Sequence, residues 1–240
     1  MTDLSVCGAT LLHLLDTPQD AGGKRFPPQI DDLPADTDVV FVLGGGNDIG
    51  YIGGIFNDTL SRSWPGSLFL YLNGTDPDEG AKMQLQLDVD GLVQRYSAVL
   101  DAIHSKAPNA YVLVVEYQAV CGPDTRPGKD VVFGADRIAY HRAVAARLLE
   151  ATRKAVVGRE AWCSNVDVAG PSETHAIGSA EPWISGFTWK LFYQGGAYHP
   201  KPEGMVAIAD LIYKKMVQLG LASPDQASKD EESEDGFIVV

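Results

Sequence analysis

The sequence predicts an α/β fold, a three-layer sandwich in which helices cover both faces of a parallel sheet. Short apolar runs of strand length alternate along the chain with longer amphipathic segments, a pattern typical of parallel sheets with crossover helices. The chain has 240 residues, 45% of them hydrophobic, which is enough for one domain with a sizeable core. We therefore expect one domain over residues 1–221 and a disordered acidic tail over residues 222–240.

Four apolar runs are expected to form the strands. The strongest lies between Pro34 and Gly44, and an equally apolar run precedes Tyr117. Proline and glycine punctuate strand ends, so these boundaries are well marked. A shorter run ends at Gly8. The predicted strands cover residues 3–7, 37–43, 110–117 and 161–168.

Helices are expected between these strands, and loops where glycine and proline cluster. Apolar residues recur at mostly three- and four-residue spacings in the long segments, which indicates one buried helix face. The predicted helices cover residues 9–15, 83–105, 135–157 and 203–219. The predicted loops cover residues 19–35, 44–73, 118–134 and 171–196, the last with Trp183, Phe187 and Trp189 as aromatic anchors.

Charge and cysteine content exclude several classes of protein. The net charge is −13, whereas a nucleic-acid-binding protein needs a basic surface. The longest apolar runs are too short to cross a bilayer, so no integral membrane segment is expected. The three cysteines include no pair with two residues between them, which argues against a zinc or dithiol site. We expect no metal and no cofactor.

The loop after the strongest strand has the composition of an oxyanion hole. Residues 44–50 read Gly-Gly-Gly-Asn-Asp-Ile-Gly. Glycines let the backbone turn sharply and approach a ligand, and the Asn47 amide can donate to a developing oxyanion. The alternative is a glycine-rich turn into a helix, capped by Asn47 or Asp48. A dinucleotide site is disfavoured because the glycine spacing is one residue off its fingerprint.

His199 is the candidate general base. It lies in a loop just before the last predicted helix, followed by Pro200, a position suited to proton transfer. The alternative is a histidine that only marks the entry to the helix. Among the other histidines, His175 is interpreted as structural, and those at 13, 104 and 141 fall within predicted helices.

Taken in order, these motifs resemble the SGNH, or GDSL-type, hydrolase family. Residues 45–48 (Gly-Gly-Asn-Asp) match its third block, His199-Pro200 matches its fourth, and residues 8–10 (Gly-Ala-Thr) match its second. The resemblance implies a flavodoxin-like sheet and hydrolysis of a carboxylic ester. It implies His199 as base, the Gly8 N–H and the Asn47 side chain as oxyanion donors, and Gly45, Gly46 and Asp48 as their supporting loop. The substrate would be a small ester, an acyl lipid or an acetylated glycan.

Two departures from the family pattern concern catalysis. The Gly-Asp-Ser block with the nucleophile is not present. Ser5 is the one alternative, but only 40 residues separate it from Gly45, which is short for this family. Cys7 has no basic neighbour in sequence to lower its pKa. The acid of the Asp-x-x-His block is also missing, and Gly196 stands in its place; its backbone carbonyl could orient the histidine instead.

The missing block implies a missing first strand. In a flavodoxin-like sheet of order 2-1-3-4-5 that strand lies between the second and third. We therefore interpret the chain as a truncated form of a secreted ester hydrolase, although it opens without a signal peptide. The alternative is a catalytically dead binding protein that keeps the fold. Neither interpretation fixes the oligomeric state.

Overall fold

The computed structural model describes residues 1–73 and 87–224. Its centre is a parallel sheet of three strands in the order β3-β4-β5, formed by Val39–Val42, Tyr111–Val115 and Cys163–Val166. The predictions of strands at 37–43, 110–117 and 161–168 are confirmed, each shorter by one or two residues at either end.

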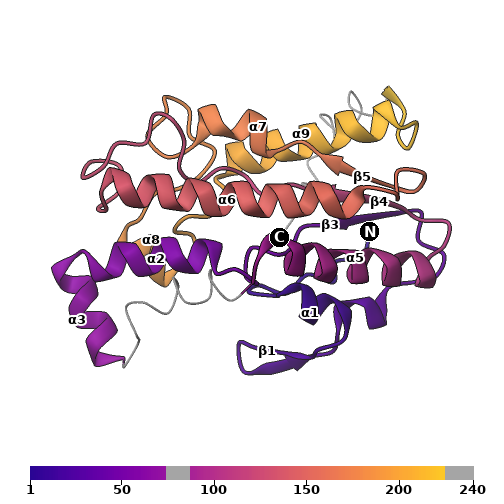
Figure 1. The fold of residues 1–240 in the computed structure, drawn as a ribbon, viewed down its shortest axis with the longest axis horizontal. Helices are drawn as coiled ribbons and strands as arrows, with labels where there is room; N and C mark the ends of the chain where they lie inside the picture. The colour runs from indigo at the N-terminus through magenta and orange to yellow at the C-terminus, as the bar shows by residue number, and fades with distance from the viewer. Residues whose placement is uncertain (74–86, 225–240) are drawn as a thin grey trace.

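Alternate residues of the strands build two apolar clusters on opposite faces of the sheet. Val112 and Val114 point to the side covered by α5 (Val89–Lys106) and α6 (Ala135–Val156). Leu113 and Val115 point to the side covered by α9 (Pro202–Gln218). Figure 1 shows α9 above the strands and α5 below them, while α6 crosses the view at the height of the strands. This arrangement confirms the three-layer α/β sandwich.

The predicted strand at residues 3–7 is wrong, because the described chain has no strand there. Leu4 packs against the main apolar cluster, but most of this segment is exposed. A strand needs a neighbour to bond its N–H and C=O groups. Within residues 1–73 and 87–224 this segment has no such neighbour, and β3 bonds to β4 alone.

The α9 side of β3 is thinly covered. Phe41 and Leu43 point to this side and are 45% and 51% exposed, although apolar residues of this size are normally buried in a central strand. Within α9 itself only Gly204 is fully buried. The sheet is therefore well packed on the α5 and α6 side and partly open beside β3 on the other.

Three predicted loops contain regular structure. The loop predicted at 44–73 contains α2 (Tyr51–Ser61) and α3 (Trp64–Leu72). Gly53 and Gly54 weaken the helical signal, but burial of Ile55 and other side chains of α2 overrides it. The loop predicted at 19–35 contains a hairpin of β1 (Gln19–Ala21) and β2 (Lys24–Phe26), followed by η1 (Gln29–Asp32). The loop predicted at 171–196 contains η2 (Glu173–His175) and α8 (Trp189–Tyr193).

The predicted helices are confirmed with small shifts in their ends. The predictions at 9–15 and 203–219 correspond to α1 (Leu11–Leu15) and α9, while a short α7 (Ala169–Ser172) follows β5. The prediction at 83–105 corresponds to α5, although its residues 83–86 lie outside the described residues. Residues 225–240 of the predicted acidic tail also lie outside them. No helix in the described ranges is long and apolar enough to cross a bilayer.

A buried carboxylate joins α2 to α6. Asp58 accepts hydrogen bonds from His141 Nε2 at 2.6 Å and Arg137 Nε at 2.7 Å, and both Asp58 and His141 are buried. Burial acts to raise the pKa of Asp58, but the hydrogen bonds from His141 and Arg137 outweigh it and lower the pKa to about 2. The ionised form of Asp58 is therefore the one that holds the two helices together.

Replacing Asp58 by asparagine is expected to lower the free energy of unfolding by about 3 kcal/mol, because the buried partners lose their counter-charge. The depressed pKa of Asp58 contributes roughly 2 kcal/mol. This contribution is present above the unfolded-state pKa of 3.8 and is lost as the pH falls through about 2. Urea unfolding of Asp58→Asn at pH 7 measures the cost of the substitution. Unfolding of the wild type at a series of acid pH values measures the contribution of the depressed pKa. Asp101→Asn, which breaks an exposed pair with Arg159, is the control and should cost about 1 kcal/mol or less.

Candidate active site

The loop from Gly44 to Gly50 follows the carboxyl end of β3 and packs against Tyr96 and Tyr117. The Tyr96 hydroxyl donates to the Gly44 carbonyl at 2.5 Å. Gly45 has a φ of +80° and would bring a Cβ within 2.9 Å of the Tyr96 ring. A Cβ at Gly46 would lie 2.7 Å from the Tyr117 ring. Both glycines are therefore required by backbone conformation or close packing.

Asn47 and Asp48 join this loop to the segment that carries Gly8. The Asn47 Nδ2 donates to the Ala9 carbonyl at 2.9 Å, and the Leu11 N–H donates to Asp48 Oδ2 at 2.9 Å. The other oxygen of Asp48 accepts from Arg95 at 2.8 Å. The structure thus brings together two of the predicted blocks, which lie 38 residues apart in the chain.

Gly8 precedes the residue whose carbonyl accepts from the Asn47 amide. It has a φ of +79°, which glycine adopts without strain. Within residues 1–73 and 87–224 its N–H makes no backbone hydrogen bond. The amide of Asn47 has two hydrogens, and the bond to Ala9 takes one of them. One hydrogen of the Asn47 amide therefore remains, and the bonded partner of that amide is the residue after Gly8.

His199 is exposed and its ring is oriented by a backbone carbonyl. Nδ1 lies 2.7 Å from the carbonyl oxygen of Ala197. A carbonyl only accepts, so Nδ1 carries the proton and, in the neutral ring, Nε2 keeps a lone pair. The prediction of Gly196 is wrong by one residue: the Gly196 carbonyl instead accepts from the Ser185 hydroxyl, because the backbone turns at Tyr198.

Tyr198 fixes this turn. Its φ is +58°, a conformation that non-glycine residues rarely adopt and that marks local strain. The ring is buried against Phe56 of α2 at 5.2 Å, and its hydroxyl lies 2.6 Å from the Thr59 hydroxyl. Burial raises the pKa of Tyr198 to about 12, so the hydroxyl stays protonated. His199 is thereby anchored to the helix that follows the Asn47 loop.

The other histidines have structural partners. His175 stacks on Trp183 at 4.3 Å and its Nδ1 lies 2.7 Å from the Glu181 carbonyl. His104 stacks on Trp162, and His141 is bonded to Asp58. His13 Nδ1 accepts from the Thr10 N–H at the start of α1.

No candidate nucleophile is hydrogen-bonded to the His199 ring in the described ranges. Ser5 is exposed in the irregular N-terminal segment. Ser185 is close to His199 in space, but its hydroxyl donates to the His199 backbone carbonyl at 3.1 Å rather than to the ring. Cys7 is exposed, whereas burial raises the pKa of Cys121 to about 12 and keeps it a thiol.

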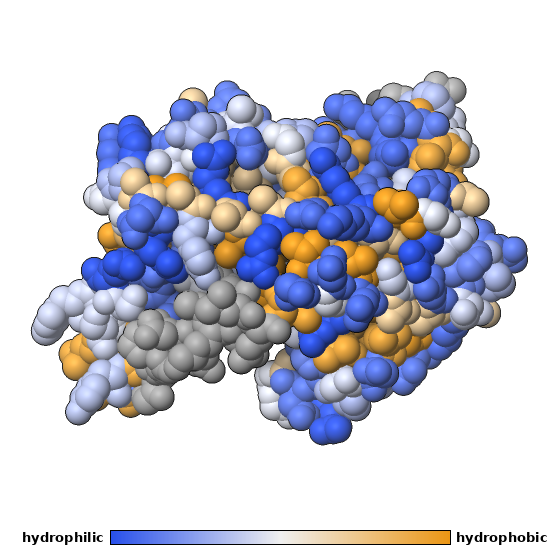
Figure 2. Space-filling view, in the orientation of Figure 1, coloured by the Kyte–Doolittle hydropathy of each residue, from blue (hydrophilic) through white to orange (hydrophobic). Residues whose placement is uncertain are grey.

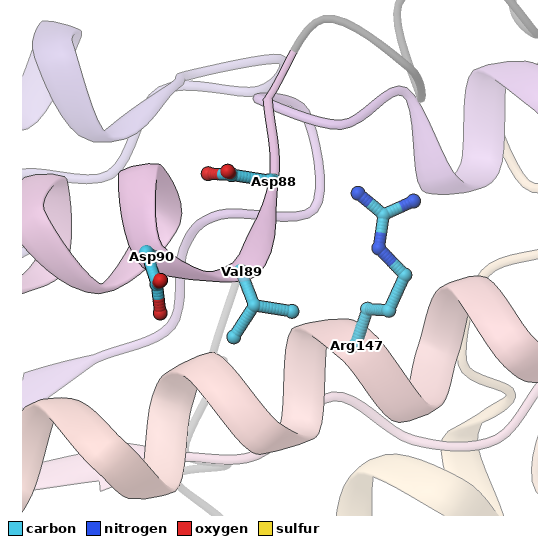
Figure 3. A pocket seen from close by; sticks show the side chains of 4 residues that line it. All are labelled: Asp88, Val89, Asp90 and Arg147. Carbon is cyan, nitrogen blue, oxygen red and sulfur yellow. The ribbon is translucent and has the colours of Figure 1, made fainter.

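A hollow elsewhere on the molecule contains none of these residues. It has a volume of about 460 Å³ and lies at the N-terminal end of α5, lined by Asp88, Val89, Asp90 and Arg147. In Figure 3, Arg147 rises from α6 toward the segment that carries Asp88 and Val89. The described ranges contain no cluster of three His, Cys, Asp or Glu side chains that could hold a metal ion.

Comparisons with known proteins give the family and the fold of the chain. The model of the GDSL-like lipase/acylhydrolase family matches residues 2–207. An extracellular lipase from Streptomyces rimosus has a similar structure, with a TM-score of 0.53, 22% identity and coverage of 76% of this chain and 72% of that chain. The phospholipase A1 from Streptomyces albidoflavus NA297 gives a TM-score of 0.56 and 20% identity over the same shares. No curated protein sequence matches the chain.

Proposed function

Because this chain belongs to the GDSL-like lipase/acylhydrolase family, we propose that its site serves the hydrolysis of carboxylic esters, with His199 as general base and Gly8 and Asn47 as oxyanion donors. The observation that carries this proposal is the hydrogen bond from Asn47 to Ala9. This bond ties the Asn47 side chain to the residue after Gly8, which supports a role for both in holding a carbonyl oxygen.

The arrangement supports both proton transfers of ester hydrolysis. Nε2 of His199 takes the proton of an attacking hydroxyl while the substrate carbonyl oxygen becomes an oxyanion held by Gly8 and Asn47. When the oxyanion collapses, the C–O bond to the alcohol breaks and Nε2 returns the proton to it. A water molecule then releases the acid by the same two steps. The Ala197 carbonyl keeps the ring in the required tautomer throughout.

Residues 1–240 lack an identified hydroxyl for the first step, so we propose that this chain by itself hydrolyses esters weakly or not at all. The carbonyl at Ala197 brings no full charge to the imidazolium that forms, unlike a triad aspartate. The carbonyl can still orient the ring. We therefore expect the loss of the aspartate to lower ester hydrolysis less than the loss of the serine does. Small esters, acyl lipids and acetylated glycans all remain candidate substrates.

A serine-bearing form of the chain tests the proposal. We extend the N-terminus with an apolar strand that ends in Gly-Asp-Ser, and prepare a matched extension that ends in Gly-Asp-Ala. Hydrolysis of p-nitrophenyl butyrate is expected only from the serine form, while residues 1–240 and the alanine form stay at background. Equal rates from the serine and alanine forms, both folded by circular dichroism, contradict the proposal.

The second candidate function is a binding protein that keeps the fold without catalysis. The observation that favours it is the absence of a serine hydroxyl bonded to the His199 ring within the described residues. It is distinguished by a cooperative melting transition of residues 1–240 and by saturable binding of an ester without turnover. A serine form that hydrolyses the ester excludes it as the function of the site.

A further inference from the structure

A short antiparallel ladder holds the backbone of His199. The Ser185 N–H donates to the His199 carbonyl at 3.0 Å, and the Lys201 N–H donates to the Trp183 carbonyl at 2.7 Å. Between Trp183 and Ser185 lies Ile184, which is buried and belongs to the main apolar cluster. One side of the ladder is therefore anchored in the core, and the backbone of the candidate base is fixed to it.

The Ser185 hydroxyl adds a link that the ladder alone does not make. A hydroxyl has one hydrogen to donate, and here two backbone carbonyls share it. One is the carbonyl of Gly196, and the other is the carbonyl of His199 at 3.1 Å. The hydroxyl thus joins both ends of the turn that runs from Gly196 to His199, and Ala197 lies inside that closed turn.

The two carbonyls near the His199 ring differ in how many donors they already bind. The Gly196 carbonyl accepts from the Ser185 hydroxyl and from the His199 N–H at 3.4 Å. A carbonyl oxygen has two lone pairs, so both are engaged. The Ala197 carbonyl accepts from no backbone N–H within residues 1–73 and 87–224, and it is the one that lies 2.7 Å from His199 Nδ1. The donors on Gly196 therefore leave Ala197 as the acceptor for the ring.

We propose that Ser185 is a positioning residue: its hydroxyl binds the Gly196 carbonyl and so directs His199 Nδ1 to the Ala197 carbonyl. The result is a single tautomer, with the proton on Nδ1 and the lone pair on Nε2. Ser185 thereby contributes to the orienting part of the role of a triad acid, without a negative charge. The use of this tautomer in ester hydrolysis rests on the proposed function, whereas the tautomer itself does not.

The tautomer of His199 can be measured in residues 1–240 without any reaction. The probe is a two-bond proton–nitrogen correlation spectrum of protein labelled in its five histidines, recorded at a pH of about 8, above the ordinary pKa of an imidazole. His199→Ala identifies the signals of this ring. Ser185→Ala removes the hydroxyl and keeps the backbone N–H, while Ser185→Thr retains a hydroxyl.

The matched control is Ser67→Ala. It removes a serine hydroxyl that also donates to a backbone carbonyl, that of Ser61 at 2.7 Å. Ser67 belongs to α3, which forms the projecting lobe at the lower left of Figure 1 and Figure 2. Melting curves establish that every variant is folded.

The wild type, Ser67→Ala and Ser185→Thr are expected to show His199 with the proton on Nδ1 alone. Ser185→Ala should show both tautomers, and in the serine-bearing chain it should lower kcat by about tenfold or more with little change in KM. A wild-type ring with the tautomer mixture of an unstructured histidine overturns the proposal, and so does a Ser185→Ala ring with the wild-type spectrum. A serine-bearing chain that is inactive although His199 keeps its Nδ1 proton refutes the proposed function and leaves the role of Ser185 standing.

Discussion

Replacing His199 by alanine in the serine-bearing chain is expected to lower kcat for p-nitrophenyl butyrate by roughly 10⁴-fold or more. The loss is expected to be large because the proposed mechanism assigns both proton transfers to His199, and each of the other histidines is engaged in a structural contact. Nδ1 donates to the Ala197 carbonyl at 2.7 Å, so Nε2 is the ring nitrogen left to act as the proposed base. Initial rates at saturating substrate measure the effect.

The matched control for this experiment is His175→Gln. His175 stacks on Trp183 and bonds the Glu181 carbonyl, so its loss should affect stability more than kcat. Circular dichroism of both variants must show the wild-type fold. If His175→Gln loses as much kcat as His199→Ala while remaining folded, the assignment of the general base is wrong.

Replacing Gly45 by alanine is expected to cost about 2–5 kcal/mol of the free energy of unfolding, a large part of the 5–15 kcal/mol of an ordinary domain. A side chain at a φ of +80° costs roughly 1–2 kcal/mol. The added Cβ would lie 2.9 Å from Tyr96 and 3.0 Å from Leu148, and overpacking of a core costs about 1–3 kcal/mol. Urea unfolding followed by circular dichroism measures the sum.

Gly53→Ala provides the opposite control on the same stretch of chain. Gly53 lies on the exposed face of α2, and nothing lies within 4 Å of a Cβ added there. Alanine is a better helix former than glycine by about 1 kcal/mol, so this variant should be slightly more stable than the wild type. Equal stability of Gly45→Ala and the wild type would show that the loop is free to move away from Tyr96.

The parts of the fold that were predictable from sequence are those in which local pattern and burial agree. β4 is an uninterrupted apolar run, and every residue of it except Tyr111 is buried. α6 has a clear helical period over 22 residues. By contrast, α2 contains two adjacent glycines, and only its tertiary packing makes it a helix. The strand expected at residues 3–7 failed because strand formation depends on a neighbour that a local pattern does not contain.

The candidate site was predictable in its residue types and less so in its connections. Asn47, Gly8 and His199 were proposed from ordered motifs and stay a prediction. The partner of Asp48 is Arg95, 47 residues away, and no spacing rule indicates it. The choice between the carbonyls of Gly196 and Ala197 depends on the positive φ of Tyr198, which a tyrosine in sequence does not suggest.

The unpaired side of β3 has a consequence for how this protein behaves as its concentration rises. In the described chain β3 bonds to β4 alone, so its outer N–H and C=O groups can pair with a strand of another molecule. The flanking Phe41 and Leu43 would bury apolar area in such a contact, and no proline, bulge or lysine on the strand opposes it. Addition propagates when β3 pairs with the outer edge of β5 in another molecule, because the β3 edge of that molecule stays open. Self-association should therefore compete with refolding, and a lysine in place of Phe41 is the substitution suited to suppress it.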